Sequence, residues 1–130
     1  MAGVKLDGAG DQKMKTLEAA LFTIGPIHAM VERAAMVERA AMEVKANKPI
    51  GTIPHMIKRL AVPMQGQLKG QFGMIADQVA QFIMNSTRGG RGDQQKIRGM
   101  REGLAMIKTA VELAKNKVKH QHAVAIETAD

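Results

Sequence analysis

The chain has no cysteine, no tryptophan and no tyrosine, and its only aromatic residues are three phenylalanines among 130 residues. Without cysteine, disulfides, thiolate catalysis and zinc fingers are excluded. With so few aromatic rings, the chain cannot offer a stacking platform to single-stranded nucleic acid. It also holds a single serine, Ser86, and nothing in it resembles an active site. We therefore expect a protein that is not an enzyme and that needs no cofactor or metal.

A long apolar run is also missing. The N-terminal residues 1–11 lack the apolar region of a secretory signal. The longest weakly charged apolar stretch, residues 19–31, is much shorter than the ~20 residues that a membrane-spanning helix needs. The sequence therefore predicts no membrane span, no secretion by a recognisable signal, and a location in the cytoplasm or nucleoid.

Aliphatic residues and positive charge are abundant. Hydrophobic residues make up 45% of the chain, with 11 methionines, so the core is expected to be aliphatic. The net charge is +7. Between residues 88 and 119, nine Lys and Arg residues stand against three acidic residues, so nine minus three, or +6, falls in this segment. Charge concentrated in this way indicates a polyanion or an acidic protein surface as the partner.

The spacing of apolar residues predicts an all-α protein, a small bundle of about four helices. We expect an N-terminal arm over residues 1–10, the helical bundle over 11–119 and a C-terminal tail over 120–130. The expected helices are 11–24, 26–46, 54–86 and 93–119.

Local signals set the ends of these helices. Asp11 and Asp93 are suitable N-caps for the first and fourth helices. The pair Gly25 and Pro26 is expected to end the first helix, because proline suits the first position of a new one. Pro63 is expected to kink or break the long third helix.

The second expected helix contains the hexamer AMVERA at 29–34 and again at 35–40. Six residues advance a helix by about 600°, so each copy is rotated by about 240° from the one before. Apolar residues then fall on more than one side, which predicts more than one neighbour, within the fold or in another subunit. The main stripe is expected to contain Ile27, Met30, Ala34, Val37, Ala41 and Val44, with Val31, Met36 and Met42 off it.

The third expected helix carries three glycines on one face and a nearly uncharged, glutamine-rich surface. Glycines on one face indicate close approach by another backbone, and tight helix packing is favoured over a ligand surface. The glutamine-rich surface suits contact with the same protein or a paralogous subunit. The predicted subunit-contact residues are Gly66, Gly70, Gly73, Met36 and Met42.

The fourth expected helix combines an apolar seam with a basic flank. Arg101, Lys108 and Lys115 are spaced by seven residues along the seam, and cations at intervals on a rigid element suit a phosphate backbone. For any single lysine, a solvated surface position is the simpler interpretation. The predicted seam is Ile97, Met100, Leu104, Ile107, Val111, Ala114 and Val118. The predicted nucleic-acid-binding residues are Arg88, Arg91, Lys96, Arg98, Arg101, Lys108, Lys115 and Lys119.

Two other motifs have simpler interpretations. The segment 88–93, RGGRGD, lacks the GK[ST] of a nucleotide-binding loop, and a single RGG is not a repeat. His120 and His122 are two residues apart and do not share a helical face, so surface histidines are favoured over metal ligands.

The overall plan resembles a known family. A small-residue N-terminal arm, a proline-containing long helix (TIPHMIKRLAVPMQGQ) and a Gly/Arg loop (STRGGRGD) in a short, basic, helical chain resemble the major capsid proteins of filamentous archaeal viruses. The resemblance implies a virion protein whose helices enclose duplex DNA in a filament.

Three hypotheses follow. The first is a structural protein that coats or packages duplex nucleic acid, DNA in particular, through phosphate contacts, either capsid-like or nucleoid-associated. The second is a helical-bundle adaptor that binds an acidic protein partner, and the third is a cofactor-carrying four-helix bundle. The salt dependence of DNA binding separates the first two, and an optical spectrum tests the third.

Overall fold

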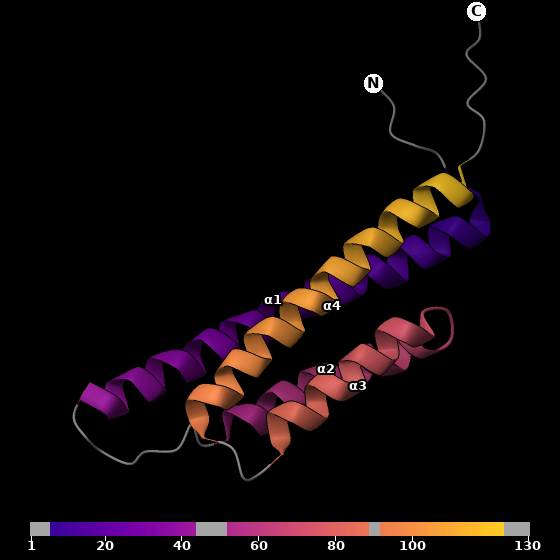
Figure 1. Ribbon diagram of the computed structural model, residues 1–130. Helices are drawn as coiled ribbons and strands as arrows, with labels where there is room; N and C mark the ends of the chain where they lie inside the picture. The colour runs from indigo at the N-terminus through magenta and orange to yellow at the C-terminus, as the bar shows by residue number, and fades with distance from the viewer. Residues whose placement is uncertain (1–5, 44–51, 89–91, 124–130) are drawn as a thin grey trace, which may run out of the picture.

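The computed structural model describes residues 6–43, 52–88 and 92–123, which form four α-helices (Figure 1). Within these residues there is no strand, and one isolated bridge joins Leu6 to Ala123. The all-α bundle of four helices predicted from the sequence is confirmed. The helices are α1 (Gly8–Glu43), α2 (Ile53–Lys69), α3 (Gly73–Thr87) and α4 (Asp93–Gln121).

The helices form a ring in which each packs against the next, and α4 closes the ring against α1. α1 and α4 are the long helices and run antiparallel side by side, while α2 and α3 form a shorter hairpin beside them (Figure 1). The end of α4 returns to the start of α1, and the C-terminal end of α1 extends beyond the start of α4 (Figure 1). The interface between α1 and α4 is therefore long.

The core is aliphatic, as the composition predicts. It contains Leu, Ile, Val, Met and Ala side chains from all four helices, and Phe82 is its one buried aromatic residue in the described part of the chain. The predicted seam of α4 is confirmed, since six of its seven residues are buried and Ala114 is partly buried. Burying one such aliphatic side chain contributes about 1.5–3 kcal/mol.

The buried stripe of α1 differs from the predicted one. Val31, expected off the stripe, is fully buried, whereas Met30, expected on it, is only partly buried. The observed stripe keeps a strict three-four spacing through the whole bundled part of the helix. It consists of Met14, Leu17, Ala20, Ile24, Ile27, Val31 and Ala34.

α1 continues through Gly25 and Pro26, so the predicted helix end at this pair is wrong. The buried stripe crosses the pair without interruption, from Ile24 to Ile27. Burial on both sides offsets the ~3 kcal/mol that a proline costs inside a helix. Pro26 itself is exposed.

α1 also begins earlier than predicted. The Oδ1 atom of Asp7 accepts a hydrogen bond from the N–H of Gly10 at 2.7 Å, which is the geometry of an N-cap. Asp7 therefore caps the helix, and Asp11 lies in its first turn. Residues 8–10, assigned to the N-terminal arm, belong to α1.

The ends of α4 show two smaller differences. Gly92 occupies the N-cap position, so the predicted cap at Asp93 is wrong by one residue. The Asp93 carboxylate is still in the first turn, where it interacts favourably with the helix dipole. The helix ends at Gln121, so the first two residues assigned to the C-terminal tail are helical.

The single long helix predicted over 54–86 is two helices. α2 continues through Pro63, and the chain reverses at Gly70–Phe72. Phe72 has φ −132° and ψ 59°, which are not helical angles, at the start of α3. Gly70 follows the last residue of α2 and Gly73 is the first residue of α3, and glycine has low helix propensity. Folding back there buries apolar residues of both helices, among them Met64 and Leu68 of α2 and Ile75 and Val79 of α3.

His122 joins the two ends of the long helix pair. Its carbonyl accepts a hydrogen bond from the N–H of Asp7 at 3.0 Å, and its Nδ1 lies 3.1 Å from Asp7 Oδ1. Lys13 Nζ lies 3.3 Å from His122 Nε2. Since a lysine can only donate, both side-chain contacts are satisfied when His122 is neutral with its proton on Nδ1. The Gly10 hydrogen bond is the main reason that the pKa of Asp7 is lowered.

Replacing Gly10 by alanine tests this junction. A Cβ atom at Gly10 would overlap the Cβ of His122, whereas a Cβ at Gly8 would have nothing within 4 Å. We expect Gly10→Ala to lower the free energy of unfolding by roughly 1–2 kcal/mol through overpacking. Gly8→Ala should change it by less than about 0.5 kcal/mol. Urea denaturation of both variants measures the difference, and equal midpoints would contradict the close contact.

Candidate nucleic-acid interface

Four basic residues form one row along α4, here called the α4 basic row. They are Arg101, Lys108, Lys115 and Lys119. Steps of seven and then four residues return close to the same side of a helix. Arg101, Lys108 and Lys119 are exposed, and Lys115 is partly exposed. From Arg101 to Lys119 the row is about 27 Å long, at 1.5 Å per residue.

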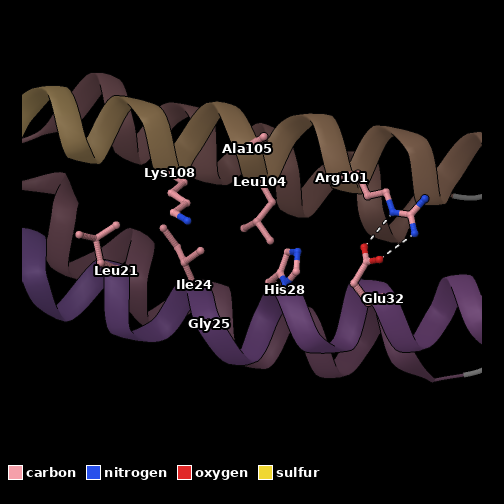
Figure 2. A pocket seen from close by; sticks show the side chains of 9 residues that line it. All are labelled: Leu21, Ile24, Gly25, His28, Glu32, Arg101, Leu104, Ala105 and Lys108. Atoms are coloured by element: carbon pink, nitrogen blue, oxygen red, sulfur yellow. Dashed lines mark hydrogen bonds and ion pairs between the residues drawn. The ribbon is translucent and has the colours of Figure 1, made fainter.

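The row borders an open cleft of about 500 Å³ between α1 and α4. Figure 2 shows Leu21 and Ile24 of α1 and Leu104 of α4 on its apolar part, with Lys108 and His28 directed into the space between the helices. Gly25, which has no side chain, lies on the α1 side. The cleft therefore combines an apolar base with a cationic edge.

Arg101, at one end of the cleft, already has a partner. Its Nε and Nη2 atoms each donate a hydrogen bond of 2.8 Å to the carboxylate of Glu32 on α1 (Figure 2). These hydrogen bonds are the main reason that the pKa of Glu32 is lowered and that of Arg101 is raised. The two side chains remain 48% and 41% exposed. Two of the donors of Arg101 would have to leave Glu32 before binding a phosphate, so Lys108 is the more available cation.

A second cleft, of about 440 Å³, lies nearer the start of α4. Arg101 and Lys108 against Glu32 give the first cleft a net charge of +1. The charged residues that line the second cleft, three arginines and two glutamates, give it the same net charge. These residues are Arg39, Arg98, Arg101, Glu38 and Glu102.

The basic cluster predicted at the start of α4 is not brought onto the row. Lys96 is twelve residues before Lys108, which places it about 120° around the helix. Arg98 is exposed but borders the second cleft. Arg88 is exposed at the end of α3, and Arg91 lies outside the described residues.

The predicted glycine contacts are not helix-packing contacts within the chain. Gly66, Gly70 and Gly73 are exposed, and a Cβ at any of them would have nothing within 4 Å. The interpretation of tight packing is therefore wrong for these glycines, and contact with another subunit stays a prediction. Close approach occurs instead at Gly103, where a Cβ would lie 3.2 Å from the ring of Phe82.

The predicted methionine contacts are on α1. Met36 is 71% exposed, as its position off the stripe predicts. Met42 belongs to the last turns of α1, and its side chain is outside those described.

Sequence reasoning missed the residues that α1 contributes to the clefts. His28 and Glu32 are four residues apart and share one face of a helix, which was a usable local signal. The ion pair between Glu32 and Arg101 could not be predicted from local sequence, because the two residues are 69 positions apart in the chain.

The fold and the clefts define an all-helical four-helix bundle with a basic helix along an open cleft. Comparisons with protein families, with curated proteins and with solved structures found no match for the chain. In the described part of the chain, no group of three or more His, Cys, Asp or Glu side chains is placed to hold a metal ion. Among the helices of the described residues, none combines the length and the apolar character of a membrane span.

Proposed function

We propose that the protein coats duplex DNA as a structural protein, through contacts between the α4 basic row and the phosphate backbone. The observation that supports the proposal is the alignment of Arg101, Lys108, Lys115 and Lys119 on one accessible side of a single long helix. A row of about 27 Å is as long as about eight base pairs of duplex. Cations on a rigid helix contact phosphates of any sequence, which is what coating requires.

The rest of the molecule supports a role without base readout. None of the three phenylalanines lies on the α4 basic row. Phe82 is buried, Phe72 is partly buried, and Phe22 is on α1. The described chain therefore offers the row no aromatic side chain for stacking on bases. A coating protein of this kind is capsid-like or nucleoid-associated, and it has no catalytic role in this proposal.

Replacing Lys108 by glutamine tests the proposal. Binding to duplex DNA should weaken steeply with salt, with a log–log slope of about −0.9 per phosphate neutralised. Lys108→Gln should weaken binding to unrelated sequences alike and make this slope less steep by about one unit. Fluorescence anisotropy at several salt concentrations measures both effects.

Lys58→Gln is the matched control. Lys58 is also exposed, but it lies on α2, diagonally across the ring from α4. Its replacement removes the same charge and should leave the slope as it is in the parent protein. An equal change in both variants would show that net charge, and not the row, governs binding. Absence of salt-sensitive DNA binding in the parent protein would rule the proposal out.

A second candidate function is supported by the shape of the α1–α4 cleft. An apolar base with Lys108 and His28 at its edge suits an acidic amphipathic helix from a protein partner. Leu21→Gln changes the apolar base and leaves the cations in place. If that variant keeps DNA binding but a bound acidic peptide is lost, the protein is an adaptor. If DNA binding is salt-sensitive and no such peptide binds, the coating function holds.

A further inference from the structure

The outer face of α1 carries a second regular row, here called the α1 outer row. Its residues follow the three-four spacing of a packed helix, but every one of them is exposed. Phe22 is 81% exposed and Met36 is 71% exposed. The row consists of Phe22, Pro26, Ala29, Arg33, Met36 and Ala40.

The repeated hexamer explains how one helix has two such faces. Val31 and Ala34 of the first copy are buried in the bundle. Their equivalents in the second copy, Val37 and Ala40, are partly and fully exposed, because each copy is rotated by about 240°. From residue 35 to residue 40, no side chain is buried. The second copy therefore lies at the end of the bundle, where Ala35 is partly buried and Glu38 and Arg39 border the second cleft beside the first turns of α4.

We propose that a second copy of this chain packs antiparallel along the α1 outer row, with Ala29 on the two-fold axis. Phe22 and Met36 are each seven residues from Ala29, so the antiparallel register places Phe22 against the partner's Met36. Sulfur and aromatic rings attract each other in such contacts. The small side chain of Ala29 lets the two helices approach closely at the axis.

Charge complementarity selects this register. Glu18 and Arg39 are exposed and lie within about 60° of each other around α1. In the antiparallel register, Glu18 lies within one residue of the level of the partner's Arg39, on the same side of the contact. The symmetry makes this ion pair twice. A parallel arrangement would instead place Glu18 beside the partner's Glu18 and Arg33 beside the partner's Arg33.

The contact is a single helix pair, so it buries less than the ~800 Å² per partner of a standard interface. The dimer is therefore expected to dissociate on dilution. It does not depend on DNA. Lys108, Lys115 and Lys119 of the α4 basic row lie outside the contact, and only Arg101 shares a cleft with Arg39. Failure of this proposal and failure of the DNA-coating proposal are therefore separate results.

Single-cysteine variants test the register, because the chain has no native cysteine. A disulfide needs Cα atoms within about 7 Å. Ala29→Cys should form a cross-linked dimer under mild oxidation. Phe22→Cys alone should not, since the two copies of residue 22 lie about 21 Å apart along the antiparallel helices. A mixture of Phe22→Cys and Met36→Cys chains should cross-link between the two.

The cross-linking results separate the arrangements. Efficient cross-linking by Phe22→Cys alone would show a parallel contact and overturn the register. No cross-linking by Ala29→Cys or by the mixture, at roughly 100 µM protein, would overturn the dimer. The variants change exposed positions, so circular dichroism should show the same helix content as the parent chain.

Mass measurements on nuclease-treated protein test the charge pairing. Light scattering should show a mass that rises with concentration from 14.0 kDa towards twice that value. Glu18→Arg should reduce the association, and Glu18→Arg combined with Arg39→Glu should restore it. Met74→Gln is the control, since Met74 is 82% exposed on α3, outside the row. A parent chain that stays at 14.0 kDa, or a double variant that fails to recover, would overturn the proposal.

Discussion

Replacing Ile107 by alanine is expected to lower the free energy of unfolding by about 2–5 kcal/mol, the usual cost of truncating a large buried aliphatic side chain. Ile107 is 1% exposed and lies in the middle of the α4 seam. The ring of helices is closed by α4, which packs against both α1 and α3. A cavity at this position therefore removes packing contacts between α4 and the two helices on either side of it.

The neighbouring residue provides the control for this prediction. Met106 is 62% exposed, so Met106→Ala should change the free energy of unfolding by less than about 0.5 kcal/mol. Alanine has a higher helix propensity than either residue, so propensity cannot account for a loss of stability at Ile107. Urea denaturation followed by circular dichroism measures the two midpoints. Similar midpoints would show that the seam is not the core of the folded protein.

The seam of α4 was readable from the sequence because its period is unbroken. From Ile97 to Val118 an apolar residue recurs every three or four positions, with no glycine or proline in the seam itself. Such a pattern has one structural solution, an amphipathic helix against a core. Local signals and tertiary packing agree along this segment, and the prediction holds residue by residue.

The boundaries of the other helices depended on tertiary packing. Gly25 and Pro26 are local signals for a helix end, but burial of Ile24 and Ile27 on one continuous stripe outweighs them. In the third predicted helix, Pro63 likewise does not end the helix. The chain turns at Gly70 instead, where folding back buries apolar residues on both α2 and α3. Helix propensity alone could not show which of these glycines and prolines would end a helix.

The candidate interface was predictable only in part. The seven-residue spacing of Arg101, Lys108 and Lys115 correctly placed them on one side of a helix. The sequence could not show that Arg101 is held by Glu32, because that contact joins α4 to α1. Nor could it show that Lys108 borders an apolar cleft, since the cleft exists only once the two helices are packed.

Replacing Pro26 by alanine is expected to stabilise the protein. Pro26 lies well inside α1 and has no N–H, so the carbonyl of Phe22 receives no hydrogen bond from the next turn. Alanine restores that bond and removes the clash of the proline ring, a gain of about 3 kcal/mol. Losing the proline also raises the conformational entropy of the unfolded chain, which lowers the free energy of unfolding by about 0.4–1 kcal/mol. The net increase in the free energy of unfolding should therefore be about 2 kcal/mol.

Pro54 provides the contrast, because the same substitution there should have the opposite sign. Pro54 is in the first turn of α2, where the missing N–H is not needed, and it is buried. Pro54→Ala therefore restores no hydrogen bond and loses packing. Gly25→Ala, beside Pro26, should stabilise by about 1 kcal/mol through helix propensity alone, since its Cβ would meet nothing within 4 Å. Urea midpoints should rise for Pro26→Ala and Gly25→Ala and fall for Pro54→Ala. A fall for Pro26→Ala would mean that the packing of α1 against α4 requires the backbone bend that a proline imposes.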